Sequence, residues 1–250
     1  MNTNIYGSKA IADNPQITKT RSRRLSRAAG VLYLVTFVSI LTVAFYAPAR
    51  NPNYITGPGP DNGIIFGGIL EIIVALACIG TAVALYPVVK RQGEAYALGF
   101  VGARILEAGT IFAGVISLMT LVTLRQSGAG AEGVVLGRAL LAMYDWFHLG
   151  QNLIPAVNAV LLGSLLYRAR LVPRILPVLG FIAAPLLVAN TIILMFGITG
   201  PLLTLTTLGV IPIAVWEFSL GVWLVVKGFY ATPLTAAFDQ NEGGTEWRAG

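Results

Sequence analysis

YALGFVGARILEAGTIFAGVISLMTLVTL, residues 96–124, is an apolar run with two charged residues, Arg104 and Glu107, in its interior. The run is long enough to cross a hydrocarbon core of ~30 Å, which requires about 20 helical residues. A charged side chain inside a bilayer is costly and normally faces a partner or a cavity. Because the two residues are three positions apart, they share one face of the expected helix. We therefore expect a membrane helix whose polar face turns away from lipid.

Five other stretches have a similar length and composition: residues 28–47, 63–86, 139–167, 175–196 and 203–226. Hydrophobic residues make up 56% of the chain and charged residues only 11%, whereas soluble domains carry about 25% charged residues. Most of the expected helix faces are apolar all round, which is typical of burial in lipid or in a bundle. The sequence thus predicts an all-α polytopic membrane bundle with six transmembrane helices and the lipid bilayer as its main partner.

The basic residues predict the orientation of this bundle. If the N-terminus is cytoplasmic and six spans alternate, thirteen Lys and Arg residues lie in cytoplasmic segments, and three (Arg50, Arg125 and Arg138) lie in outside loops. This asymmetry follows the positive-inside rule and predicts that both termini are cytoplasmic. The net charge of +6 is concentrated before the first span, which is typical of a topology signal or an anionic-lipid contact. We therefore expect no nucleic-acid partner.

The chain divides into three parts by composition. Residues 1–24 are polar and basic and predict a flexible cytoplasmic tail, residues 25–230 form the transmembrane domain, and residues 231–250 predict a second flexible cytoplasmic tail. Residues 48–62 are rich in Pro and Gly and predict an irregular outside loop over the mouth of the bundle. Residues 134–145 are amphipathic, and they either extend span four or form a separate interfacial helix.

The polar residues inside the spans are the candidate functional site. Asp145, His148 and Asn152 are spaced i, i+3 and i+7, so they share a helix face. One guanidinium cannot neutralise all the carboxylates, so Arg104 should pair with one of them, and the others should hold protons or meet water, a cation or His148. The predicted polar cavity consists of Glu71, Arg104, Glu107, Asp145, His148, Asn152 and Glu217.

The residue inventory argues against a metal centre and against a nucleophilic enzyme. The chain has one histidine and one cysteine, Cys78, and catalytic zinc usually takes three protein ligands. Cys78 is therefore expected to pack within span two. None of the serines inside the spans stands in a G-x-S-x-G setting. We expect no metal and no cofactor.

Several short motifs carry a resemblance to a known family. They are RAAG at 27–30 with Tyr33, LGFVGARILE at 98–107, YRARLVPR at 167–174 with Leu179-Gly180, and GVWLVVKGF at 221–229, together with Glu71, His148 and Glu217. The chain resembles the bacterial membrane family filed as domain of unknown function four-three-eight-six, over about residues 24–230. The resemblance implies a multi-pass protein of the bacterial cytoplasmic (inner) membrane. It supplies no catalytic residues.

Three functions remain open at this point. The first is a protein that binds or moves a small solute, an ion or a proton through the polar cavity, with Arg104 holding an anionic group. The second is a structural or sensory subunit whose polar core only fixes packing. The third is a membrane-embedded hydrolase or lipid-modifying enzyme with His148 as base and Asp145 or Glu71 as orienting carboxylate. The sequence leaves enzymatic activity open but favours a non-enzymatic role, and it does not indicate the oligomeric state.

Overall fold

The computed structural model describes residues 15–198 and 201–243, and all its regular elements within these ranges are helices, as the sequence predicts. In chain order they are α1 (Pro15–Thr36), α2 (Ser39–Phe45), the short 3₁₀ helix η1 (Ala47–Arg50), α3 (Asn62–Val89), α4 (Glu94–Gln126), α5 (Gly133–Ala169), α6 (Ile175–Met195), α7 (Pro201–Val226) and α8 (Pro233–Gly243).

Five segments of the described chain are long and apolar enough to cross a membrane: Arg21–Arg50, which contains α1 from Arg21 onward together with α2 and η1, and helices α3, α4, α5 and α6. In α7 the corresponding segment is the shorter apolar helix Val210–Val226. The helices therefore indicate a multi-pass membrane protein, and a sixth complete span stays a prediction.

The distribution of side chains on α4 supports a lipid environment. Arg104 and Glu107 are only 1% and 6% exposed, whereas their neighbours Ile105 and Leu106 are 54% and 61% exposed. A soluble protein would place these residue types the other way round. Because the exposed large apolar residues continue along the other long helices, the outer surface of the bundle fits acyl chains rather than water.

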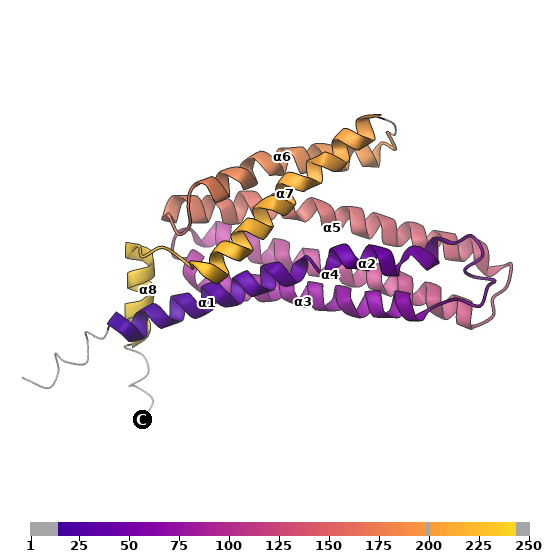
Figure 1. Cartoon of the computed structure of the whole chain (residues 1–250), viewed down its shortest axis with the longest axis horizontal. Helices are drawn as coiled ribbons and strands as arrows, with labels where there is room; N and C mark the ends of the chain where they lie inside the picture. The colour runs from indigo at the N-terminus through magenta and orange to yellow at the C-terminus, as the bar shows by residue number, and fades with distance from the viewer. Residues whose placement is uncertain (1–14, 199–200, 244–250) are drawn as a thin grey trace, which may run out of the picture.

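The long helices pack in a cyclic order: α1 contacts α3, α3 contacts α4, then α4 contacts α5, α5 contacts α6, α6 contacts α7, and α7 returns to α1 (Figure 1). Helices α4 and α7 are therefore on opposite sides of this ring. The hairpin of α6 and α7 leans away from α2 and α3 at its turn (Figure 1). Helix α8 and the beginning of α1 lie at one end of the bundle, which we call the terminal end, and the other end is the loop end.

The first span is interrupted between α1 and α2, which the sequence did not predict. At the break, the amides of Phe37 and Val38 donate to carbonyls three residues back, those of Leu34 (3.2 Å) and Val35 (3.0 Å). The Thr36 hydroxyl also donates to the carbonyl of Tyr33 at 2.6 Å. Bonds of this kind compete with the regular helical pattern. The interruption leaves room beside α7, and a cavity described below uses this space.

Helix α5 resolves the alternatives for residues 134–145. It runs without interruption from Gly133 to Ala169 and continues through Pro155, so this segment extends span four. Its 37 residues correspond to roughly 55 Å at 1.5 Å per residue, well beyond the ~30 Å hydrocarbon core. The first part of α5 therefore extends past the hydrocarbon at the loop end.

Helical structure also occurs where the sequence predicts flexible tails. Helix α1 begins at Pro15, and α8 occupies Pro233–Gly243. Phe238 on α8 is buried between the guanidinium groups of Arg21 and Arg91, 5.8 and 5.1 Å from its ring centre, and Asp239 accepts hydrogen bonds from Ser22. The packing of Phe238 between Arg21 and Arg91 explains why residues 233–243 form a docked helix instead of the predicted flexible tail. The composition of this segment does not reveal partners that are distant in the sequence. Residues 1–14 and 244–250 lie outside the described part.

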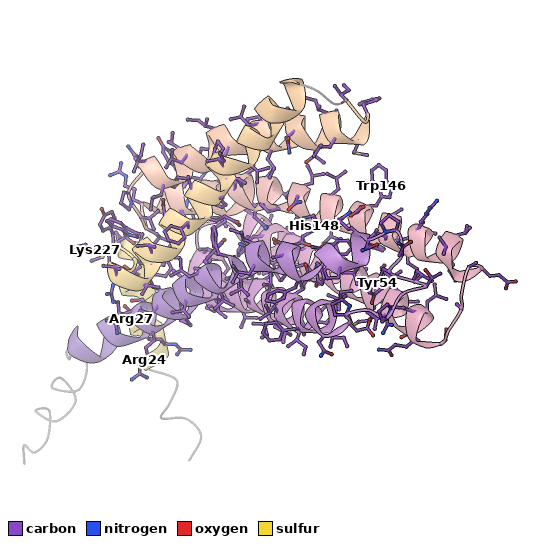
Figure 2. All side chains as sticks on the ribbon, turned by 45° about the vertical axis from the view of Figure 1, so that its right-hand side comes forward. Arg24, Arg27, Tyr54, Trp146, His148 and Lys227 are labelled. Atoms are coloured by element: carbon purple, nitrogen blue, oxygen red, sulfur yellow. The ribbon has the colours of Figure 1, made fainter. Side chains whose placement is uncertain are left out.

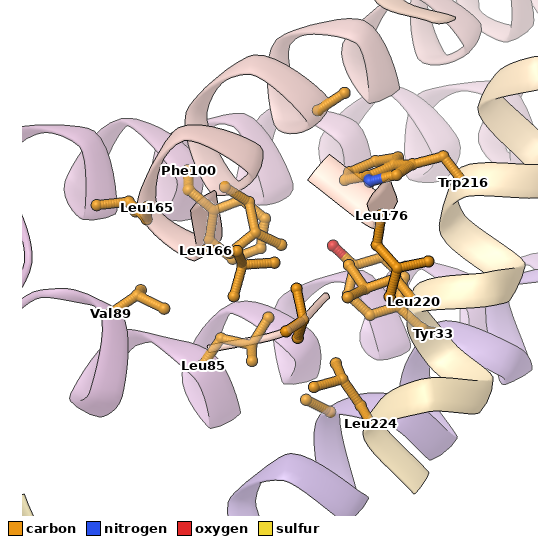
Figure 3. Close-up of a cluster of buried hydrophobic side chains, with 14 of the residues drawn as sticks. Tyr33, Leu85, Val89, Phe100, Leu165, Leu166, Leu176, Trp216, Leu220 and Leu224 are labelled. Atoms are coloured by element: carbon orange, nitrogen blue, oxygen red, sulfur yellow. The ribbon is translucent and has the colours of Figure 1, made fainter. Parts of the chain in front are cut away.

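A large apolar core fills the terminal half of the bundle (Figure 3). Its side chains come from α1, α3, α4, α5, α6 and α7, and they include Tyr33, Leu85, Phe100, Leu165, Trp216 and Leu220. Since these residues are almost completely buried, packed side chains close the terminal half, and the polar residues of the interior border this core where Arg104 meets Tyr33 and Phe100.

Candidate functional site

Arg104 on α4 forms the centre of the polar interior. Its Nη1 donates to Glu107 Oε2 at 2.9 Å, and its Nη2 donates to Glu217 Oε1 at 3.3 Å. Glu217 belongs to α7, so the second ion pair crosses the middle of the helix ring. Arg104 lies about ten residues from the start of α4, roughly 15 Å along the helix, which is near the centre of a ~30 Å hydrocarbon core.

Neutral groups complete the shell of this ion cluster. The Arg104 guanidinium lies over the rings of Tyr33 (4.6 Å) and Phe100 (5.8 Å). Asn158 Nδ2 on α5 donates to Glu107 Oε2 at 3.0 Å, and Cys78 Sγ on α3 is 3.7 Å from Arg104 Nη1. A buried charge that has such partners avoids most of the desolvation penalty. The cluster therefore ties α1, α3, α4, α5 and α7 together.

A cavity of about 180 Å³ adjoins the ion cluster. It lies between the α1–α2 break and helices α3, α4, α5, α6 and α7. Its polar lining consists of Thr36, Ser39, Glu107, Gln151, Asn152 and Glu217. Its walls are otherwise apolar, and they include Phe37, Ile40, Leu187 and Ile213. The cavity thus has an acidic, amide-bearing end and an apolar remainder.

Glu71 occupies a separate position toward the loop end. Its carboxylate accepts a hydrogen bond from Thr42 on α2 at 3.2 Å, and it is close enough to Tyr46 and Tyr144 to interact electrostatically with both. The Tyr144 ring stacks on His148, with ring centres 5.8 Å apart. Figure 2 shows His148 among the helices, while Trp146 on the same helix points outward. Glu71 and His148 are therefore linked through Tyr144 rather than by direct contact with Arg104.

Asp145 lies outside this interior. Its carboxylate pairs with Arg50 at 2.6 Å, and both side chains are about half exposed. The sequence grouped Asp145 with His148 and Asn152 because of their helical spacing, but Asp145 is turned outward beside the buried Tyr144, and Arg50 at the end of η1 pairs with it at a half-exposed position. Asp145 therefore does not line the cavity.

The seven residues of the predicted cavity fall into three groups. Arg104, Glu107 and Glu217 are in direct contact, and Asn152 lines the cavity with the two glutamates. Glu71 and His148 form the second group, and Asp145 is at the surface. Sequence reasoning expected Arg104 to pair with one carboxylate, whereas the structure shows two.

Some contributors to the site carry weaker signals in the sequence. Cys78 was expected only to pack within its span, Tyr33 was singled out only as part of a family motif, and Asn158 was not among the predicted cavity residues. Arg50 was an outside-loop charge with no evident partner. None of these roles follows from spacing along one helix, because each partner belongs to another helix.

The loop of residues 51–61 is fixed by a second, partly buried ion pair. Asp61 pairs with Arg125 at the end of α4, and Asp61 also accepts hydrogen bonds from Tyr54 (2.6 Å) and Gln126 (2.9 Å). The Arg125 guanidinium lowers the pKa of Asp61 to about 2. Ile55 packs where Gly137 of α5 leaves space. Residues 51–61 thus cover the loop end, as an irregular loop.

The chemistry of the site is that of a charged pocket rather than a metal centre. In residues 15–198 and 201–243, no three His, Cys, Asp or Glu side chains are grouped so that they could hold a metal ion. The pocket offers carboxylate, amide and hydroxyl oxygens at one end and aliphatic and aromatic carbon elsewhere. Such a pocket can bind a small polar or amphipathic molecule.

Fold and site together define a helical multi-pass membrane protein with a charged interior. The chain belongs to the family described as "Domain of unknown function (DUF4386)", which matches residues 28–228. This match confirms the resemblance seen in the sequence motifs. No curated protein and no solved structure matches the chain.

Proposed function

We propose that this chain is a six-span protein of the bacterial cytoplasmic membrane that binds a small solute or ion in its intramembrane cavity. The observation that carries the proposal is the cavity of about 180 Å³ that borders Glu107, Glu217, Gln151 and Asn152. Polar side chains in a membrane are retained where they meet each other, water or a ligand. Ion pairing alone explains why Arg104 can lie inside the membrane. It does not explain the neighbouring cavity or the amide side chains of Gln151 and Asn152 that line it.

The proposed orientation places the terminal end, with both termini, in the cytoplasm. Arg24, Arg27 and Lys227 gather at this end, whereas Tyr54 lies at the loop end (Figure 2). The positive-inside rule therefore supports a cytoplasmic terminal end. The cavity is separated from that side by the apolar core and lies on the loop-end side of Arg104.

Cysteine labelling tests the orientation. Cys78 is buried and gives a low background, so Glu94→Cys and Ser127→Cys can be introduced one at a time at exposed positions. In intact cells a membrane-impermeant maleimide should label Ser127→Cys, and it should label Glu94→Cys only after lysis. Labelling in the opposite order would reverse the orientation.

Thermal unfolding of the purified protein in nanodiscs tests ligand binding. A panel of small solutes and ions at several pH values should contain at least one compound that raises the melting temperature of the wild type. The matched variant is Ala214→Leu, which places a larger apolar side chain in the cavity wall without changing any charge. A compound that stabilises both proteins equally does not bind in the cavity.

A second candidate function is a structural or sensory subunit with a packing-only polar core. It is favoured by the complete enclosure of Arg104 between two carboxylates and two aromatic rings. If no member of the panel distinguishes wild type from Ala214→Leu, this function replaces the first. The hydrolase alternative has no such support, because His148 Nδ1 has no hydrogen-bond partner among the described residues and Asp145 is held by Arg50.

A further inference from the structure

We propose that the ligand of the cavity is a small protonated amine, with its ammonium group at the acidic end and a short apolar chain along the aliphatic wall. This inference rests on the proposed function and specifies the class of its ligand. Four features of the cavity carry it: its charge balance, its unpaired oxygen, its two-sided lining and the position of its mouth.

The charge balance of the interior favours a cation. The charged groups that act on Glu217 are Arg104 and Glu107. With both carboxylates ionised, one guanidinium leaves one negative charge without compensation. An uncompensated charge in a low-dielectric interior is expensive, and either a proton on the carboxylate or a positive ligand removes that cost.

One carboxylate oxygen is available to receive this ligand. Glu217 uses Oε1 for Arg104, and Oε2 has no hydrogen-bond partner among the described residues. Glu217 lines the cavity together with the amides of Gln151 and Asn152. An ammonium group has three N–H donors and no acceptor, so a carboxylate oxygen and amide oxygens are suitable partners for it.

The rest of the lining suits carbon rather than a hydrated ion. Phe37, Ile40, Leu187 and Ile213 form the aliphatic and aromatic wall. The volume of about 180 Å³ is many times the ~10–15 Å³ that a single water needs on the same measure. A bare metal cation would leave most of this space empty. A primary amine with a few methylene groups would fill both the acidic end and the apolar remainder of the cavity.

The mouth of the cavity gives an organic ligand a route. Of the lining residues, Ile40 on α2 and Val210 on α7 are exposed, while Cys78 and Glu107 are buried at the deep end. The opening therefore lies between α2 and α7, where the surface is apolar. At the terminal end the apolar core blocks entry (Figure 3). An amine can partition into the bilayer in its neutral form and pass this mouth, and an inorganic cation cannot follow that route without a large penalty.

Four matched probes test the charge and the chemical class of the ligand. n-Butylammonium chloride, 1-butanol, sodium butyrate and potassium chloride are added at equal concentration and ionic strength to the full-length protein in nanodiscs. The measurements are the melting temperature and the dissociation constant from ligand-observed NMR. Butylammonium should raise the melting temperature by several degrees, and the other three compounds should leave it unchanged.

Three variants locate the site. Glu217→Gln keeps the side-chain shape and leaves Arg104 paired with Glu107, and it should weaken butylammonium binding about tenfold or more, as expected for loss of a charged hydrogen-bond partner. Glu71→Gln is the control, since it also neutralises a buried glutamate in the membrane but does not line the cavity, and it should bind like wild type. If Glu217→Gln does not fold, Ala214→Leu provides the same test by filling the space.

The outcomes separate this inference from the proposed function. Stabilisation by butyrate or 1-butanol alone, sensitive to Ala214→Leu, overturns the amine and leaves a cavity-binding protein. Stabilisation by potassium chloride alone replaces the amine with an inorganic cation. Equal weakening by Glu71→Gln and Glu217→Gln places the effect outside the cavity, and no stabilisation by any compound overturns both proposals.

Discussion

Removal of the Arg104 guanidinium tests the energetic role of the central cluster most directly. Arg104→Met keeps an unbranched side chain of similar length but leaves Glu107 and Glu217 without a counter-charge in a site where Arg104 is 1% exposed. Removing one member of a buried ion pair typically costs about 3–5 kcal/mol, because the remaining charge stays desolvated. The lost contact with the Tyr33 ring, 4.6 Å away, adds about 0.5–2 kcal/mol. We expect Arg104→Met to reduce the free energy of unfolding by about 3.5–7 kcal/mol.

The size of this effect should depend on the two carboxylates. In the triple variant Arg104→Met, Glu107→Gln, Glu217→Gln, no charge remains in the cluster, and most of the lost stability should return, since replacing a buried ion pair by neutral groups is often nearly neutral. The control is Arg50→Met, which breaks the half-exposed pair with Asp145. An exposed pair contributes only about 0–1 kcal/mol.

The assay is reversible unfolding in nanodiscs or mixed micelles, followed by tryptophan fluorescence with increasing denaturing detergent. The reasoning is refuted if Arg104→Met loses no more stability than Arg50→Met. It is also refuted if the triple variant is as unstable as the single one, because the cost would then come from packing rather than from unpaired charge.

Three further predictions concern other parts of the molecule. Because Arg125 holds the pKa of Asp61 at about 2, below its unfolded value of about 3.9, the ionised pair stabilises the loop of residues 51–61 above about pH 4, and this contribution is lost as the pH falls toward 2. Hydrogen exchange of residues 51–61 should therefore accelerate over that range in wild type, and in Asp61→Asn it should be fast throughout. Gly30→Ala should destabilise the protein by about 1–3 kcal/mol through overpacking, because the new Cβ would lie 2.7 Å from a backbone oxygen of α7, whereas Gly102→Ala, with nothing within 4 Å, should be neutral or slightly stabilising in the same unfolding assay. Phe238→Ala should release α8 from the terminal end, and faster hydrogen exchange in residues 233–243, with the long helices unchanged, is the expected result.

The sequence could predict the long apolar helices because the cost of exposing polar groups to lipid is a local property of each segment. The same cost identified Arg104 and Glu107 as interior residues, and their i, i+3 spacing placed them on one face. Helical spacing placed Asp145 on one face of α5 with His148 and Asn152, but it could not reveal the half-exposed pair with Arg50, because that partner belongs to η1.

Other features depend on partners far away in the chain. Docking of α8 requires Phe238 to meet Arg21 and Arg91, and the composition of residues 231–250 contains no sign of this contact. The break after Thr36 is equally hidden, since residues 28–47 read as one uninterrupted apolar span. A cavity exists at this break only because α7 passes beside it.

The sequence by itself determined that this protein is a helical membrane chain with a few costly charges in its interior, because hydrophobicity and charge act residue by residue. Only the tertiary structure decided which charges meet. The cyclic packing order brings Glu217 of α7 across to Arg104 of α4, leaves Glu71 with Thr42 and the tyrosines, and opens a cavity at the interrupted first span. These outcomes depend on how helices cross in space, and no periodicity along a single helix encodes them.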